Sequence, residues 1–110
     1  MISNTNTFVH KGLQRFWDSE GTDHSGVDPS FKKVLKLNLA HLNAAQSLKD
    51  LQSGLGQLKY FKKLSGHEDR YSMEVNGNWR LTMTLEDART GLISKIDLED
   101  THQPGGAKRR

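Results

Sequence analysis

The sequence predicts an α+β domain in which two helices pack on one face of a mainly antiparallel sheet. In the first half of the chain, apolar residues recur at helical spacing between about residues 30 and 48. From residue 57 the apolar period changes toward two, which is typical of strands, and Asn76-Gly77 is a common dipeptide of tight hairpins. The expected order is β-α-α-β-β-β-β, and such a sheet leaves one face open.

Length and composition indicate a single small domain. The 110 residues allow one two-layer core, which we place at residues 1–102, and residues 103–110 (QPGGAKRR) are expected to be a disordered basic tail. The chain has no apolar stretch near 20 residues and no signal-peptide pattern at its start, so we expect a cytoplasmic protein without membrane contact. The absence of cysteine excludes disulfides and thiolate metal sites.

Two helices are expected in the first half. Residues 5–11 are a candidate first strand, and residues 12–17 are a candidate short helix. Asp28 and Pro29 suit the N-cap and the first position of a second helix, at about residues 30–48. The apolar face of this helix combines two rows: Phe31, Leu35, Leu39 and Leu42, and Val34, Leu37, His41, Ala44 and Leu48.

Four strands are expected in the second half, at residues 57–64, 71–75, 79–85 and 92–98. Ile93 breaks the alternation of the last one. In the first one, Lys62 shares the phase of Leu58, which is expected to point inward. Burying an ammonium group is costly, so we expect a bulge or a strand end near Lys62, through which Lys62 or Lys63 could reach the open face. The outward positions of this strand are Lys59, Phe61 and Lys63.

Arg80 is expected on the open face of the sheet. Alternation places Trp79 and Leu81 against the helices, so Arg80 points the other way, in phase with Thr82. Beside the lysines of the preceding strand, its guanidinium would form an anion site, and a planar fork of donors suits phosphate. A second interpretation stays open, in which Arg80 only pairs with the carboxylate of Glu74 across the hairpin.

Charge is distributed unevenly along the chain. Residues 32–63 hold seven lysines against Asp50 alone, whereas residues 86–100 hold five acidic residues and two basic ones. A concentrated basic block favours binding to a polyanion such as nucleic acid. A solvated helix face has the same composition, so charge alone does not decide between the two.

Five segments carry a resemblance to a known family: FVHKGLQRFW, LNAAQSLKDL, LSG, YSMEVNGNWRLTM and IDLEDTH. In these segments and their order, the chain resembles the HigB branch of the RelE/ParE superfamily, the toxic halves of bacterial toxin–antitoxin pairs. The segments cover most of residues 8–102, and YSMEVNGNWR is the most specific of them. The resemblance implies a RelE-like fold.

The resemblance also implies a function. It implies a toxin of a type II toxin–antitoxin system that cleaves mRNA in the ribosomal A site and so inhibits translation, without a metal or another cofactor. In this endoribonuclease (mRNA interferase) chemistry, the 2′-OH of one nucleotide attacks the adjacent phosphate. The implied partners are the ribosome, mRNA and a HigA-like helix-turn-helix antitoxin. Operator DNA would be bound only through the toxin–antitoxin complex.

The site residues of the family carry over by position. Arg80 matches the arginine that stabilises the phosphate, and Lys62 stands where some members have a catalytic histidine. Asp100 and His102 match a terminal pair in which the acid orients the histidine for acid–base work; alternatively, His102 only caps the last strand. The further candidate phosphate contacts are Lys59, Lys63, Arg70 and Lys36.

Two departures from the family pattern bear on activity. Thr101 replaces a tyrosine that stacks on a base in some relatives, a contact worth roughly 1–3 kcal/mol, and Ser65 stands where relatives often have lysine. Two alternatives of a different class also stay open. One is a ParE-like toxin that poisons DNA gyrase, and the other is a module that binds antitoxin or ribosome and whose cleavage has weakened.

Overall fold

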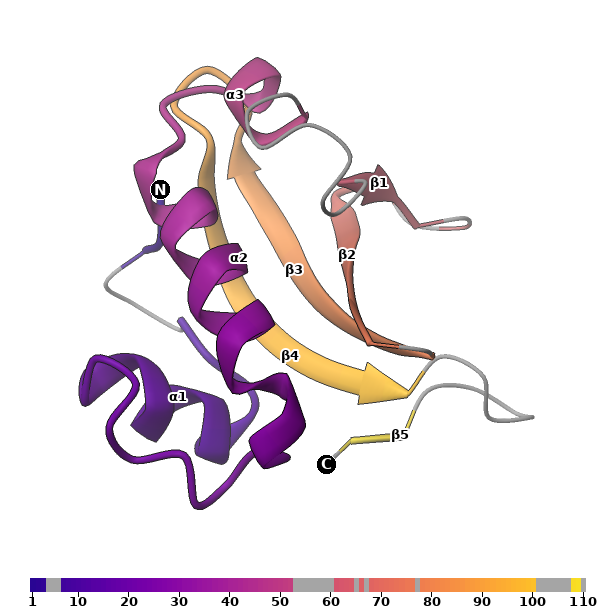
Figure 1. The fold of residues 1–110 in the computed structure, drawn as a ribbon. Coiled ribbons are helices and arrows are strands. Elements are labelled where there is room, and N and C mark those ends of the chain that lie inside the picture. Colours follow the sequence, from indigo (N-terminus) through magenta and orange to yellow (C-terminus); the bar gives the residue numbers. More distant parts are fainter. Residues whose placement is uncertain are drawn as a thin grey trace.

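The computed structural model describes residues 1–3, 7–52, 61–64, 66, 68–76 and 78–100, and the backbone of residues 108–109. Its elements are α1 (Lys11–Asp18), the 3-10 turn η1 (Pro29–Phe31), α2 (Lys32–Ala44), α3 (Leu48–Gln52), β1 (Lys62–Lys63), β2 (Arg70–Asn76), β3 (Trp79–Asp87), β4 (Leu92–Asp100) and β5 (Lys108–Arg109). The strands form one antiparallel sheet in the order β1-β2-β3-β4-β5. Figure 1 shows α2 crossing one face of this sheet, with α1 beside it. The predicted α+β class is confirmed.

The hairpin of β2 and β3 determines which side chains face the helices. The register pairs Met73 with Leu81, and both are buried in the core with the apolar side chains of α2. Successive side chains of a strand point to opposite faces. Arg80 therefore lies on the face away from the helices, as the alternation predicts.

A bulge in β4 explains why Ile93 is out of phase. Lys95 has a φ of 49°, and the register between β3 and β4 shifts by one residue beside it. The additional residue in β4 returns Ile93 to the core side, where Ile93 and Ile96 are both fully buried. The break in alternation is thus a structural feature of this strand.

The beginning of the chain differs from the prediction of a strand at residues 5–11. The segment before α1 makes two isolated bridges with β4, both parallel to it, and residues 4–6 lie outside the described part. The extended segment ends before Lys11 because His10 is the N-cap of α1. Its Nδ1 accepts a hydrogen bond from the backbone N–H of Leu13 at 2.9 Å.

The second helix is shorter than the predicted range of residues 30–48. It ends at Ala44, because Ala45 is extended, and α3 follows as a separate short helix. The first predicted apolar row is buried: Phe31, Leu35, Leu39 and Leu42. In the second row, Leu37 is 44% exposed, whereas the neighbouring Asn38 is fully buried. The sheet therefore contacts a narrower stripe of the helix than the sequence predicts.

Asn38 ties α2 to β2, and its removal is expected to cost stability. Its Nδ2 donates to the carbonyl oxygen of Glu74 at 3.0 Å, beside the register shift between Glu74 and Asn76. Replacing Asn38 by alanine leaves that carbonyl without this donor but also removes the buried Oδ1, which has no hydrogen-bond partner among the described residues. We expect the free energy of unfolding, measured in urea, to fall by about 1–2 kcal/mol.

The matched control for this substitution is Leu37→Ala, one position earlier on the same helix. Since Leu37 is 44% exposed, its truncation is expected to change stability by at most about 0.5 kcal/mol. Equal stability of the Asn38→Ala protein and its parent would show that the bond to Glu74 contributes nothing.

Candidate functional site

The sheet face away from the helices, called the outer face below, carries polar side chains from four strands. The strand register arranges them in three rows: Arg70–Thr84–Ser94, Lys62–Ser72–Thr82–Asp97 and Glu74–Arg80–Glu99. Directly opposite residues in neighbouring antiparallel strands have Cβ atoms about 4.5–5.5 Å apart. Rows two residues apart along a strand are adjacent on its face, so the rows of Lys62 and Arg80 are neighbours.

Arg80 lies near the start of β3 in the last of these rows. Its side chain is half-buried, and Nη1 donates to the carbonyl oxygen of Trp79 at 3.3 Å. The register places a carboxylate on each side of it, Glu74 on β2 and Glu99 on β4. The outer face thus presents Arg80 in a mixed electrostatic environment, with one more acidic neighbour than the sequence suggests.

Lys62 lies on the same face as Arg80, and β1 begins at Lys62, in agreement with the expected strand end. The inward phase expected for Lys62 was wrong. Lys62 pairs with Ser72, an outer-face residue, and both residues of β1 are exposed. Phe61 points inward instead, where its ring stacks on Tyr71 with centroids 4.7 Å apart. Burying the Phe61 ring and solvating the ammonium group of Lys62 both favour this phase. Lys63 takes the opposite phase, across from Tyr71.

Arg70 is held by protein acceptors on three positions of the neighbouring strands. Nη1 donates to Thr84 Oγ1 and to the carbonyl oxygen of Lys95, and Nη2 donates to Thr82 Oγ1, each at 2.9 Å. Nη2 also lies 4.0 Å from Glu99 Oε2. The guanidinium fork of Arg70 therefore joins β2, β3 and β4 across the outer face.

Glu99 is an outer-face residue that the sequence analysis does not predict. Besides its ion pair with Arg70, its Oε2 accepts a hydrogen bond from the hydroxyl of Thr82. Its direction could have been found from the alternation after Leu98, because Leu98 is a core residue and the next side chain must point outward. In the family pattern the acidic site residue is the following one, Asp100.

Asp100 has a different place from that of Glu99. It is half-buried at the end of β4, and the register puts it across from Trp79 rather than from Arg80. On its other side β5 is its neighbour, with Lys108 opposite in the backbone register. His102 and Lys59, two further candidates, lie outside the described residues, as does most of the expected tail at residues 103–110.

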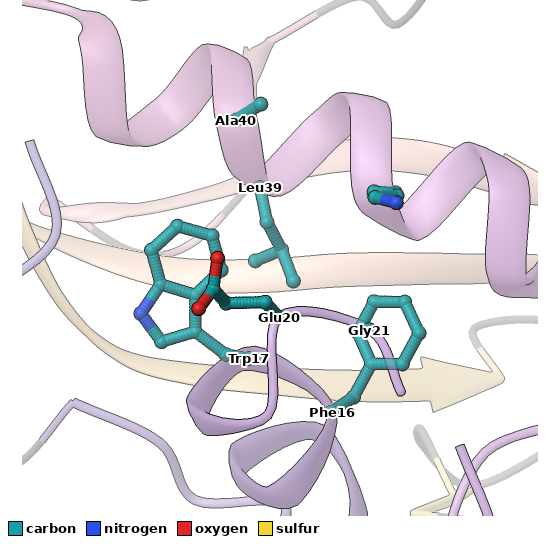
Figure 2. Close-up of a pocket in the computed structure, with 7 residues that line it drawn as sticks. Phe16, Trp17, Glu20, Gly21, Leu39 and Ala40 are labelled. Carbon is teal, nitrogen blue, oxygen red and sulfur yellow. The ribbon is translucent and has the colours of Figure 1, made fainter. Parts of the chain in front are cut away.

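Lys36 is separated from the outer face by the sheet. It is exposed on α2 and lines a groove of about 450 Å³ between α1 and α2. Figure 2 shows Phe16 and Trp17 from α1 and Leu39 from α2 around this groove. Since α2 packs on the core side of the sheet, the structure does not bring Lys36 together with Arg80.

The described residues hold neither a group of metal ligands nor a membrane-spanning helix. Within the described ranges, no group of three or more His, Cys, Asp or Glu side chains is placed to hold a metal ion. In the same part of the chain, no helix has the length and apolar character needed to cross a bilayer.

The fold and this face define a RelE-like α+β protein. A family model described as "RelE-like toxin of type II toxin-antitoxin system HigB" matches residues 6–97, which is most of the chain. The chain therefore belongs to the HigB-like family of type II toxins. A comparison with individual curated proteins found no match.

Proposed function

We propose that this protein is a ribosome-dependent mRNA endoribonuclease, and that it inhibits translation as the toxin of its pair. Membership of the HigB-like toxin family supports the toxin role. The observation that carries the nuclease role is the position of Arg80 on the outer face, in the row next to Lys62. A guanidinium and an ammonium group on one open surface suit an RNA phosphate and the negative charge that develops on it during cleavage.

In the proposed reaction, the 2′-oxygen of one nucleotide forms a bond to the adjacent phosphorus, and the bond to the 5′-oxygen breaks. Arg80 binds the non-bridging phosphate oxygens, and Lys62 supplies a second positive charge. His102 exchanges protons with the attacking or the leaving oxygen, because an imidazole titrates near neutral pH. Asp100, which lies across from Trp79 rather than Arg80, is assigned no direct contact with the phosphate. Lys59 and Lys63 contact phosphates of flanking nucleotides. The proposed reaction needs no metal ion.

The proposed partners follow from the family. A type II toxin implies an antitoxin, and we propose a HigA-like helix-turn-helix protein that binds operator DNA in complex with the toxin. The ribosome would present the mRNA in its A site, which places the proposed activity in the cytoplasm. Lys36, on the helix layer, would contact ribosomal RNA rather than the reacting phosphate.

The position of mRNA cuts tests this function directly. After induction of the protein in growing cells, primer extension on abundant messages is expected to show new 5′ ends inside translated frames within minutes. Blocking translation initiation on one reporter message should protect that message, because cleavage needs a translating ribosome. Cuts in untranslated RNA at equal frequency would contradict the ribosome dependence.

A ParE-like action on DNA gyrase predicts a different pattern. Gyrase poisoning would produce double-strand DNA breaks while messages stay intact. A binding module with weakened cleavage, which Thr101 in place of tyrosine would favour, predicts arrested translation with neither DNA breaks nor cuts. The same induced cultures therefore distinguish the three functions.

A further inference from the structure

The carboxylate of Glu99 is expected to disfavour phosphate binding at Arg80. The two residues are directly opposite in the register of β3 and β4, and Glu74 is opposite Arg80 on the other side. At a Cβ separation of about 4.5–5.5 Å, a carboxylate competes with phosphate for the guanidinium. It also repels the phosphate itself. A phosphate site at this position needs another group that engages Glu99.

Arg70 and Thr82 engage Glu99 in this way. The hydroxyl of Thr82 donates to Glu99 Oε2, and Nη2 of Arg70 lies 4.0 Å from the same oxygen. The side chains of Arg70 and Glu99 are only 21% and 19% exposed, so water and salt screen this pair less than a surface pair. The charge of Glu99 is thus offset within the protein by the guanidinium of Arg70 and the hydroxyl of Thr82.

The position of Arg70 is itself determined by the sheet. Three acceptors hold its guanidinium at 2.9 Å: two threonine hydroxyls of β3 and the carbonyl oxygen of Lys95. That carbonyl belongs to the bulged residue of β4, whose φ of 49° departs from regular strand geometry. The bulge and the two threonines fix Arg70 where it meets Glu99.

We propose that Arg70 is a positioning residue of the phosphate site: it holds and neutralises Glu99, so that Arg80 can bind the phosphate of an RNA substrate. This inference rests on the proposed function of Arg80. It assigns Arg70 a role through Glu99 in place of a direct contact with RNA, because the fork of Arg70 already donates to protein acceptors.

A charge-rescue experiment tests the proposal. In a purified translation system, mRNA cleavage is measured for the parent and for Arg70→Ala, Arg70→Ala/Glu99→Gln, Arg80→Ala and Arg89→Ala. Arg70→Ala is expected to lower kcat/KM about tenfold, which corresponds to about 1.4 kcal/mol. Adding Glu99→Gln is expected to restore kcat/KM to within about threefold of the parent, since the carboxylate that Arg70 neutralises is then absent. Arg89→Ala removes an equal charge from an exposed turn and controls for net charge.

Thermal unfolding of the same variants separates positioning from stability. The double variant still lacks the bonds of Arg70 to Thr82, Thr84 and Lys95. It is expected to stay less stable than the parent while regaining activity, which a purely structural role of Arg70 does not allow.

Three other outcomes would overturn the inference or the proposed function on which it rests. If the double variant is as impaired as Arg70→Ala, then Arg70 contacts RNA or only supports the fold, and the inference is overturned. Parental activity of Arg70→Ala overturns it as well. If Arg80→Ala cleaves like the parent, the proposed function itself fails, whatever Arg70 does.

Discussion

Replacing Arg80 by alanine is expected to slow mRNA cleavage by about 10²–10³-fold and to relieve growth arrest in cells that express the protein. Removing one preorganised donor from an oxyanion site typically costs about 2.7–4 kcal/mol of transition-state stabilisation. Arg80 is expected to fill this role because it lies on the outer face beside the row of Lys62. The measurement is the rate of cleavage in a purified translation system, together with growth after induction.

The fold of the Arg80→Ala variant should be preserved. Arg80 is half-buried at the start of its strand and outside the apolar core, so its circular dichroism spectrum and antitoxin binding are expected to match the parent. Arg89→Ala, in the exposed turn between β3 and β4, is the matched control and should arrest growth as the parent does. Growth arrest by Arg80→Ala at parental strength would rule out a role for Arg80 at the phosphate.

Replacing Gly12 by alanine is expected to destabilise the protein by about 1–3 kcal/mol or more. A Cβ at Gly12 would lie 2.2 Å from the carbonyl oxygen of Gly26 and 2.7 Å from its Cα. Both contacts are with backbone, so no side-chain rotation relieves them, and α1 must move away from the loop that precedes η1. The measurement is the midpoint of urea unfolding.

Helix propensity alone predicts the opposite effect, an increase in stability on replacing Gly12 by alanine. Within a helix, alanine is about 1 kcal/mol more favourable than glycine, and Gly12 lies inside α1. Gln14→Ala, an exposed substitution two residues later in the same helix, tests the propensity effect without the clash and is expected to be neutral or slightly stabilising. If Gly12→Ala were as stable as Gln14→Ala, the close approach of Gly12 and Gly26 would not constrain the fold.

Most of the secondary structure was predictable because it depends on local periodicity. The alternation in β2 and β3 identified their inward and outward faces, and Asn76-Gly77 located the hairpin between them. The errors occurred where a distant contact overrides the local pattern. Phe61 stacks on Tyr71, and this contact gives β1 the opposite phase from the expected one. In α2, packing against the sheet buries Asn38, whereas Leu37 is exposed.

The candidate site was predictable in part. The direction of Arg80 followed from the alternation, whereas its neighbours depend on the register between strands that are far apart in sequence. Glu99 is 19 residues after Arg80 and meets it only because β3 and β4 pair in one register. The bulge at Lys95 sets the register and the carbonyl that holds Arg70, and an irregular alternation alone does not specify it.

By itself, the sequence determined the α+β class, the two faces of the central hairpin and the family of the chain, because alternation, turn residues and motifs are local. Only the tertiary structure decided that Lys62 shares the outer face with Arg80, that Lys36 does not, and that Glu99 rather than Asp100 lies across from Arg80. The physical reason is that pairing across a sheet depends on where bulges occur and which rings stack in the core. The register and phase of the strands therefore depend on contacts between residues that are far apart in the sequence.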